Sequence, residues 1–185
     1  MSGLARDIHW ESYFNMTTIR RATEEDIQTL SERFLHFLDD KNGKIYQENV
    51  VRFGIPDEYV RKAFAEETLL KAATSGKAVF YIALEDDEIA GFAQTIQQDP
   101  DTGELDRIVV FPSHERKGIG TQLLKKVVED LRKKGTKTIV VNAGKNETHA
   151  RRFYEKNGFQ LVKETSVQAP WGKKLELAVY HLQIQ

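Results

Sequence analysis

The sequence contains no cysteine among its 185 residues, and methionine and tryptophan occur only twice each. Without cysteine the chain has no disulfide bond, no thiolate ligand for a metal and no cysteine nucleophile. The five histidines lie far apart, and their spacing matches no metal-binding motif. We therefore expect no metal site in this protein.

Long apolar runs are also absent, since none approaches the roughly 20 residues needed to span a bilayer. The first residues show no basic segment followed by an apolar one. The formal net charge of −1 lacks the basic excess that is typical of proteins that bind nucleic acid or anionic membranes. We expect a cytoplasmic protein with no nucleic-acid partner and no membrane partner.

A hydrophobic content of 40% lets a chain of this length bury one good core, which favours a single domain. Residues 1–15 mix charged and aromatic side chains without a clear period, and a regular pattern begins at Met16. We interpret 1–15 as an N-terminal extension, native or added by cloning, and 16–185 as the domain.

Strand and helix patterns then follow one another without an internal repeat. Apolar residues at helical spacing predict four helices, at about 23–38, 55–74, 119–135 and 147–157. Alternating or β-branched runs predict seven strands, at about 17–20, 78–85, 88–97, 104–111, 138–142, 159–167 and 175–184. Strand 138–142 should lie parallel to strand 104–111, because a helix connects the two.

Three local signals support these boundaries. Thr23 followed by Asp26 resembles a helix-capping arrangement. Asp86 and Asp87 mark a tight hairpin between two strands. The polar segment 40–44 should form a loop.

A glycine-rich turn joins strand 104–111 to the next helix. Gly118 and Gly120 allow backbone amides to approach a ligand closely, and the helix start presents unpaired N–H groups. Arg116 and Lys117 add positive charge, so we expect an anion site here, although glycine also serves such turns for conformational reasons alone. A dinucleotide-binding turn would need a third glycine where Leu123 stands, and no nucleotide P-loop is present.

Several stretches resemble motifs of the GNAT superfamily of acyl-CoA-dependent N-acyltransferases. The segments 19–26 and 89–92 resemble its opening strand with helix start and its third-strand signature. Residues 107–112 followed by 117–120 resemble its acyl-CoA motif, and Asn146, Ala150 and 153–159 resemble its second motif. The resemblance covers about Thr17 to Leu182. One departure is Glu115, because the family usually has Gln or Arg at that position.

The resemblance implies an α/β fold with a central mixed, mostly antiparallel sheet of about seven strands flanked by four helices. Two parallel strands would splay apart around acetyl-CoA or coenzyme A, whose pantetheine arm would pair with the sheet as a pseudo-strand. The free amide nearest Val110 would polarise the thioester carbonyl. The implied cofactor-binding residues are Val109, Val110, Phe111, Arg116, Lys117, Gly118, Ile119, Gly120, Thr121, Asn146 and Phe153. Asn146 has the alternative role of a helix cap.

The catalytic residues implied by the resemblance are two acids and a tyrosine. Glu104 and Asp106 lie two apart on one strand and therefore on one face, and Glu104 is the preferred general base. The alternative is that both are solvent-facing charges at a strand edge. Tyr154 stands at the position of the family's thiol-protonating tyrosine, with a core aromatic as its alternative role. We expect His114 and His149 to be surface residues and Trp171 to border either the acceptor pocket or solvent.

These residues imply an acetyl-CoA-dependent N-acetyltransferase that acts by direct attack of a primary amine in a ternary complex. The acceptor is a small-molecule or peptide amine, and the two acids favour a cationic one. Dimers are common in the family, so a homodimer is compatible with this interpretation. The rival hypothesis is a non-catalytic acyl-CoA-binding regulatory module of the same fold, which would be favoured if Glu104 and Tyr154 did not face one cavity.

Overall fold

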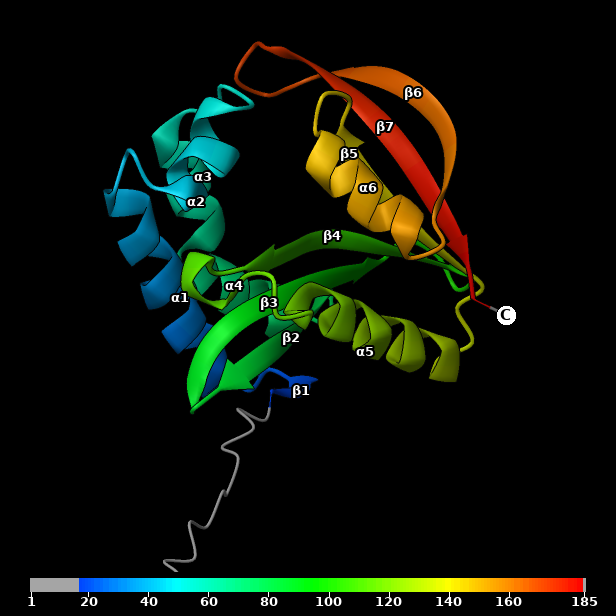
Figure 1. Ribbon diagram of the computed structural model, residues 1–185, viewed down its shortest axis with the longest axis horizontal. Helices are drawn as coiled ribbons and strands as arrows, with labels where there is room; N and C mark the ends of the chain where they lie inside the picture. The colour runs from blue at the N-terminus through cyan, green and yellow to red at the C-terminus, as the bar shows by residue number, and fades with distance from the viewer. Residues whose placement is uncertain (1–16, 185) are drawn as a thin grey trace, which may run out of the picture.

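The computed structural model describes residues 17–184, so the extension that we assigned to residues 1–15 lies outside the described residues. A seven-stranded sheet runs through the molecule in the order β1-β2-β3-β4-β5-β7-β6 (Figure 1). All neighbouring strands are antiparallel except the parallel pair β4 and β5. The predicted mixed sheet is confirmed. The strands are β1 (Thr18–Arg21), β2 (Ala78–Glu85), β3 (Glu88–Gln97), β4 (Thr102–Val110), β5 (Thr138–Gly144), β6 (Gln160–Gln168) and β7 (Lys174–Gln183).

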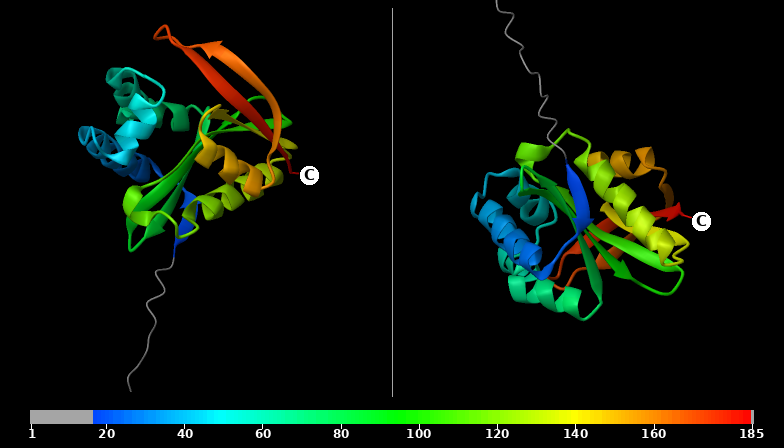
Figure 2. Two further views of the ribbon diagram at one scale, coloured as in Figure 1. Left: turned by 45° about the horizontal axis from the view of Figure 1, so that its top comes forward. Right: turned by 90° about the horizontal axis from the view of Figure 1, so that it is seen from below.

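Helices cover both faces of the sheet, with α1 to α4 on one face and α5 and α6 on the other (Figure 2). The α-helices are α1 (Glu24–Asp39), α2 (Lys44–Tyr46), α3 (Asp57–Phe64), α4 (Glu66–Thr74), α5 (Ile119–Lys133) and α6 (Thr148–Lys156). A π-helical turn, η1 (Gln47–Val51), follows α2, and a 3₁₀ turn, η2 (Pro112–His114), follows β4. We call α1 to α4 with η1 the helical lobe.

Two apolar clusters hold these layers together. The lobe-side cluster includes Phe34, Phe64, Phe92 and Phe111, and the two rings of Phe34 and Phe64 stack with centroids 3.4 Å apart. The α5-side cluster lies on the opposite face of the sheet and includes Leu105, Ile119, Leu123, Tyr154 and Tyr180. A residue of β4 that belongs to one of these clusters therefore faces the same side of the sheet as that cluster.

The helical lobe contains four α-helices and a π-helical turn, whereas the sequence pattern predicted two helices in this part of the chain. The predicted helix 55–74 is broken at Ala65, whose extended backbone ends α3 and begins α4. The hydroxyl of Ser31 on α1 donates to the carbonyl of Phe64 at 2.7 Å, so one carbonyl at the end of α3 gains a buried partner. This contact between residues 33 positions apart explains why helical periodicity alone missed the break. The predicted loop 40–44 ends before Lys44, which already begins α2, and the sequence pattern predicted neither α2 nor η1.

Local signals that involve only neighbouring residues are confirmed. Thr23 and Asp26 form a reciprocal capping box at the start of α1. Asp86 and Asp87 both have positive φ, at 49° and 63°, as a tight two-residue hairpin between β2 and β3 requires.

Candidate active site

A gap opens in the middle of the sheet between the parallel strands β4 and β5. These strands pair only at their beginning, and their last paired residues are Glu104 and Val140. On its other edge β4 stays paired with β3 as far as Val110, and β5 stays paired with β7 as far as Gly144. The facing edges of β4 beyond Glu104 and of β5 beyond Val140 therefore have no strand partner among residues 17–184, as the predicted splay requires (Figure 1).

The direction of one hydrogen bond shows which β4 amides face this gap. The N–H of Phe111 donates to the carbonyl of Ala90 on β3 at 2.9 Å. Backbone groups alternate along a strand, so the N–H and C=O groups of Val110 and Ile108 point away from β3 and toward the gap. Phe111, a predicted cofactor residue, has its amide occupied and its side chain fully buried in the lobe-side cluster. Ile108 was not among the predicted cofactor-binding residues, although its position two residues before Val110 on the same strand indicates that its backbone faces the same side.

The turn that follows β4 presents further backbone donors. Arg116 and Gly118 have positive φ of 60° and 78°, and α5 begins at Ile119 without a side-chain cap. Because the first amides of a helix have no partner within it, the N–H groups of Ile119, Gly120 and Thr121 are available to an anion at the positive end of the helix dipole. Space around Gly118 is open, since a Cβ there would meet no atom within 4 Å. The backbone of this turn therefore fits a pyrophosphate group.

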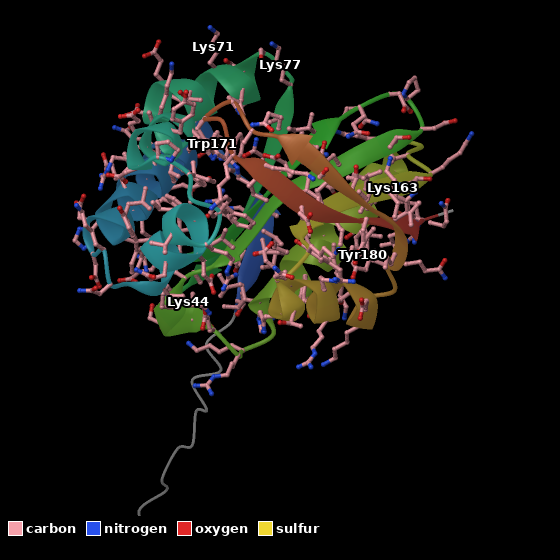
Figure 3. The ribbon with its side chains drawn as sticks, turned by 90° about the horizontal axis from the view of Figure 1, so that it is seen from above. Lys44, Lys71, Lys77, Lys163, Trp171 and Tyr180 are labelled. Carbon is pink, nitrogen blue, oxygen red and sulfur yellow. The ribbon has the colours of Figure 1, made fainter. Side chains whose placement is uncertain are left out.

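Two charged side chains in the same turn already have protein partners. Lys117 Nζ donates to Glu85 Oε2 at 2.8 Å, and Glu115 forms an ion pair with Lys44 of α2. The carboxylate that departs from the family pattern is thus paired with a cation of the helical lobe, near the turn as seen in Figure 3. This pairing reduces the negative charge that Glu115 would otherwise bring to a bound phosphate.

Glu85 is only 4% exposed and contacts the side chains of both Lys117 and His114. His114 Nδ1 lies 2.6 Å from the same Oε2 atom that accepts the hydrogen bond from Lys117. Lys117 first and His114 second hold the pKa of Glu85 below its usual range. The prediction of a surface His114 is wrong, because its side chain is 11% exposed and packed against Glu85, which lies 29 residues earlier. His149 is exposed, as predicted.

Strand β4 and helices α5 and α6 meet beside the gap. A Cβ built on Gly120 would lie 3.5 Å from the Phe153 ring and 3.7 Å from Val110, so these three predicted cofactor residues are neighbours. Asn146 is exposed just before α6, and no side chain caps this helix. The alternative role of Asn146 as a helix cap is therefore absent from the structure.

The two candidate bases lie on the lobe side of β4. Leu105 packs in the α5-side cluster, so its neighbour Glu104 points to the opposite face. There Glu104 Oε1 accepts a hydrogen bond from Asn142 Nδ2 at 3.1 Å, and Oε2 accepts one from Gln98 Nε2 at 2.7 Å. The β3–β4 register shifts between Gln94 and Thr95, which makes Asp106 the extra residue of a β-bulge.

The carboxyl group of Asp106 has a perturbed pKa. Burial raises the pKa of the Asp106 carboxyl, the neighbouring Arg107 guanidinium opposes this rise, and the negative charge of Glu104 adds to it. A carboxylate whose pKa is raised is a better proton acceptor at neutral pH. Both acids therefore remain candidates for the general base.

Tyr154 occupies the other face of the sheet. Its side chain is 8% exposed and packs against Phe159 and Tyr180 in the α5-side cluster. Burial, followed by the charge of Glu147, raises the pKa of the Tyr154 hydroxyl, so this group stays protonated at neutral pH. Glu104 and Tyr154 therefore lie on opposite faces of the sheet.

The loop between β6 and β7 reaches across to the helical lobe (Figure 1). Trp171 on that loop makes an edge contact with Tyr59 of α3, with ring centroids 5.7 Å apart (Figure 3). Arg52, just after η1, forms an ion pair with Glu147 at 3.1 Å and so connects the lobe to the start of α6. Trp171 is therefore packed against the lobe, and the alternative of a fully solvated loop does not hold for this residue.

Residues 17–184 contain neither a candidate metal-binding cluster nor a membrane-spanning helix. Within that range no three or more His, Asp or Glu side chains are grouped so that they could hold a metal ion. No helix in the described part of the chain is long and apolar enough to cross a membrane.

Comparison with known proteins gives related sequences. A family model described as the acetyltransferase (GNAT) family matches residues 6–159. The uncharacterized N-acetyltransferase YvbK of Bacillus subtilis (strain 168) is 35% identical over 81 residues, which are 44% of this chain and 52% of that protein. The spermidine N(1)-acetyltransferase of Thermoplasma acidophilum is 25% identical over 143 residues, which are 77% of this chain and 88% of that protein. The chain thus spans about half the length of its Bacillus relative.

A solved structure has the same fold. The PaiA N-acetyltransferase from Thermoplasma acidophilum in complex with coenzyme A superposes with a TM-score of 0.68 at 19% sequence identity. The similarity covers 91% of this chain and 99% of that one.

Proposed function

This chain belongs to the GNAT family of acetyltransferases, and we propose that it moves the acetyl group of acetyl-CoA directly to a primary amine. The observation that carries the proposal is the gap between β4 and β5, which the amides of Ile108 and Val110 face next to the uncapped start of α5. The spermidine acetyltransferase among its relatives acts, by its name, on an amine, which supports an amine acceptor here.

The backbone would hold the cosubstrate at two places. The amides of Ile119, Gly120 and Thr121 would bind the pyrophosphate, and the open edge of β4 would pair with the pantetheine arm. Phe153 lies beside Gly120, and Asn146 is exposed just before α6. Val109, also predicted to bind the cosubstrate, instead packs in the lobe-side cluster and is paired with Phe92 of β3. Acetyl-CoA supplies an acetyl group that is activated as a thioester.

The chemistry that we propose needs a base on one face and an acid on the other. Glu104, or Asp106 beside it, takes the proton of the acceptor ammonium on the lobe side, directly or through a water. The amine nitrogen forms a bond to the acyl carbon while an amide of Ile108 or Val110 donates to the acyl oxygen. The carbon–sulfur bond breaks, and Tyr154 protonates the departing sulfur from the α5 side.

The placement of Glu104 and Tyr154 on opposite faces suits this scheme. An amine that enters from the lobe side meets the carboxylates, and the thiol leaves toward the tyrosine, so neither proton has to cross the gap. By the single-cavity criterion stated for the rival hypothesis, however, this placement favours the non-catalytic module, and the thiol-release experiment decides between the two.

The test is release of free thiol from acetyl-CoA in the presence of a panel of primary amines, together with calorimetry of coenzyme A binding. We expect coenzyme A to bind and thiol release to depend on the amine. Binding without amine-dependent thiol release across the panel would instead support the non-catalytic acyl-CoA-binding module.

A further inference from the structure

Arg107 stands immediately after the β4 bulge, next to the candidate bases. A bulge places consecutive residues on one side of a strand, and the Arg107 guanidinium accordingly lies over the ring of Phe64 in the lobe-side cluster, 4.4 Å from its centroid. Its Nε atom is 3.3 Å from Asp106 Oδ2. The guanidinium is therefore held in one orientation, by an aromatic face and by one carboxylate, beside the acceptor side of the gap.

One nitrogen of this guanidinium is unpaired within the described part of the chain. Its Nη1 atom is enclosed and has no hydrogen-bond partner among residues 17–184. The side chain is 28% exposed, so a ligand can still reach part of it from the lobe side. Burial lowers the pKa of Arg107, as expected for a cation with too little compensating charge, and Asp106 offsets only part of this effect. A purely structural arginine would normally have its buried donors satisfied.

Gln94 provides a second unpaired group at the same place. It is the residue of β3 directly paired with Arg107 and is 6% exposed. Its Oε1 atom has no partner within the described part of the chain. Buried side-chain polar atoms are seldom left without a hydrogen bond, and each such atom has a free-energy cost. Arg107 and Gln94 thus place one unpaired donor and one unpaired acceptor on directly paired residues of β4 and β3.

We propose that Arg107 and Gln94 bind a carboxylate-bearing acceptor, so that the substrate is a primary amine with a carboxylate a few bonds away, of the amino-acid type. This inference rests on the proposed function and names its substrate class. The planar guanidinium fork matches a carboxylate in geometry. The Gln94 oxygen and the Asp106 carboxylate accept from the ammonium group of the same molecule.

The experiment compares matched acceptors that differ only in the carboxylate: lysine with cadaverine, ornithine with putrescine, and histidine with histamine. We expect kcat/KM to be about 10-fold to 100-fold higher for the carboxylated member of at least one pair, the range that a charge-assisted hydrogen bond supplies. Equal rates, or faster acetylation of the decarboxylated amines, would overturn the inference and leave the proposed function standing. Coenzyme A binding with no thiol release from any pair would instead contradict the proposed function.

Substitutions then test which residues discriminate between carboxylated and decarboxylated acceptors. Arg107→Gln should remove the preference by lowering the rate of the carboxylated acceptor, with little change for its decarboxylated partner. Gln94→Leu should reduce the preference through KM, which gives a second readout if Arg107→Gln fails to fold. Arg61→Gln is the matched control, because Arg61 lies on α3 in the same lobe and pairs with Asp57 and Asp39. A preference that persists in folded Arg107→Gln protein would refute the assignment.

Discussion

Lys117 and Glu85 are joined by a hydrogen bond of 2.8 Å between Nζ and Oε2, which ties the turn before α5 to the end of β2. Thirty-two residues separate the two along the chain. Together with His114, this contact holds in place the turn whose backbone amides we assign to the pyrophosphate. The turn therefore has a buried anchor on the side away from the proposed ligand.

Replacing this anchor should weaken the fold in a pH-dependent way. Glu85→Gln should lower the free energy of unfolding by about 1–3 kcal/mol at neutral pH, because a buried charged acceptor with two donors is lost. Lys117 and His114 lower the pKa of Glu85 in the folded state from the ordinary value of 4.5, so the stabilisation is complete above that value. It is lost as pH falls through the lower folded-state pKa. Denaturant unfolding of both proteins between pH 3 and 7 measures this, and a difference that does not shrink at low pH would contradict it.

Cosubstrate binding should be sensitive to bulk at Gly120. A single Cβ there makes ordinary contacts with Phe153 and Val110, so Gly120→Ala should fold and retain most coenzyme A affinity. Gly120→Val should fold as well but should block the approach of the pyrophosphate to the start of α5, with at least a 10-fold loss of affinity. Calorimetry with coenzyme A, after a check of thermal unfolding, provides the measurement. Undiminished affinity in folded Gly120→Val protein would remove the pyrophosphate from this turn.

The base can be identified from pH–rate profiles. Glu104→Gln should lose about 100-fold in rate at low pH, where few acceptor amines are already neutral, and less at high pH. Asp106→Asn serves as the matched variant, since it removes the neighbouring carboxylate on the same face. Burial raises the pKa of Asp106. If Asp106 is the base, the rate should therefore fall on acidification at a pH well above the usual pKa range of an aspartate, and only in proteins that retain Asp106. Unchanged profiles in both variants would leave ordered water as the base.

Tyr154 should act as the acid that protonates the sulfur. Burial and Glu147 keep its hydroxyl protonated, and Tyr154→Phe preserves the ring that packs against Phe159 and Tyr180. The variant should fold and bind coenzyme A nearly as well as the wild type but turn over about 100-fold more slowly. Turnover is to be measured at saturating acetyl-CoA. Activity within about threefold of the wild type, well under the range for a positioned acid, would make Tyr154 a packing residue.

The sequence by itself determined the features that depend on neighbouring residues. The capping box of Thr23 and Asp26, the hairpin at Asp86 and Asp87 and the amphipathic helix α5 each arise from side chains within a few positions of one another. Local propensity and periodicity therefore predicted all seven strands and the start of α5. The motifs around Gly118 and Tyr154 were enough to identify the family.

Tertiary structure alone decided the features that depend on residues far apart in the chain. The hydroxyl of Ser31 donates to a carbonyl at the end of α3, just before the break at Ala65. Glu85 packs against His114, which the sequence pattern predicted to lie at the surface. The bulge at Asp106 arises from pairing with β3, and it turns Arg107 toward the lobe beside the two acids. No local sequence pattern predicts these features, because each is stabilised by a contact that forms only once the sheet and both helical layers have assembled.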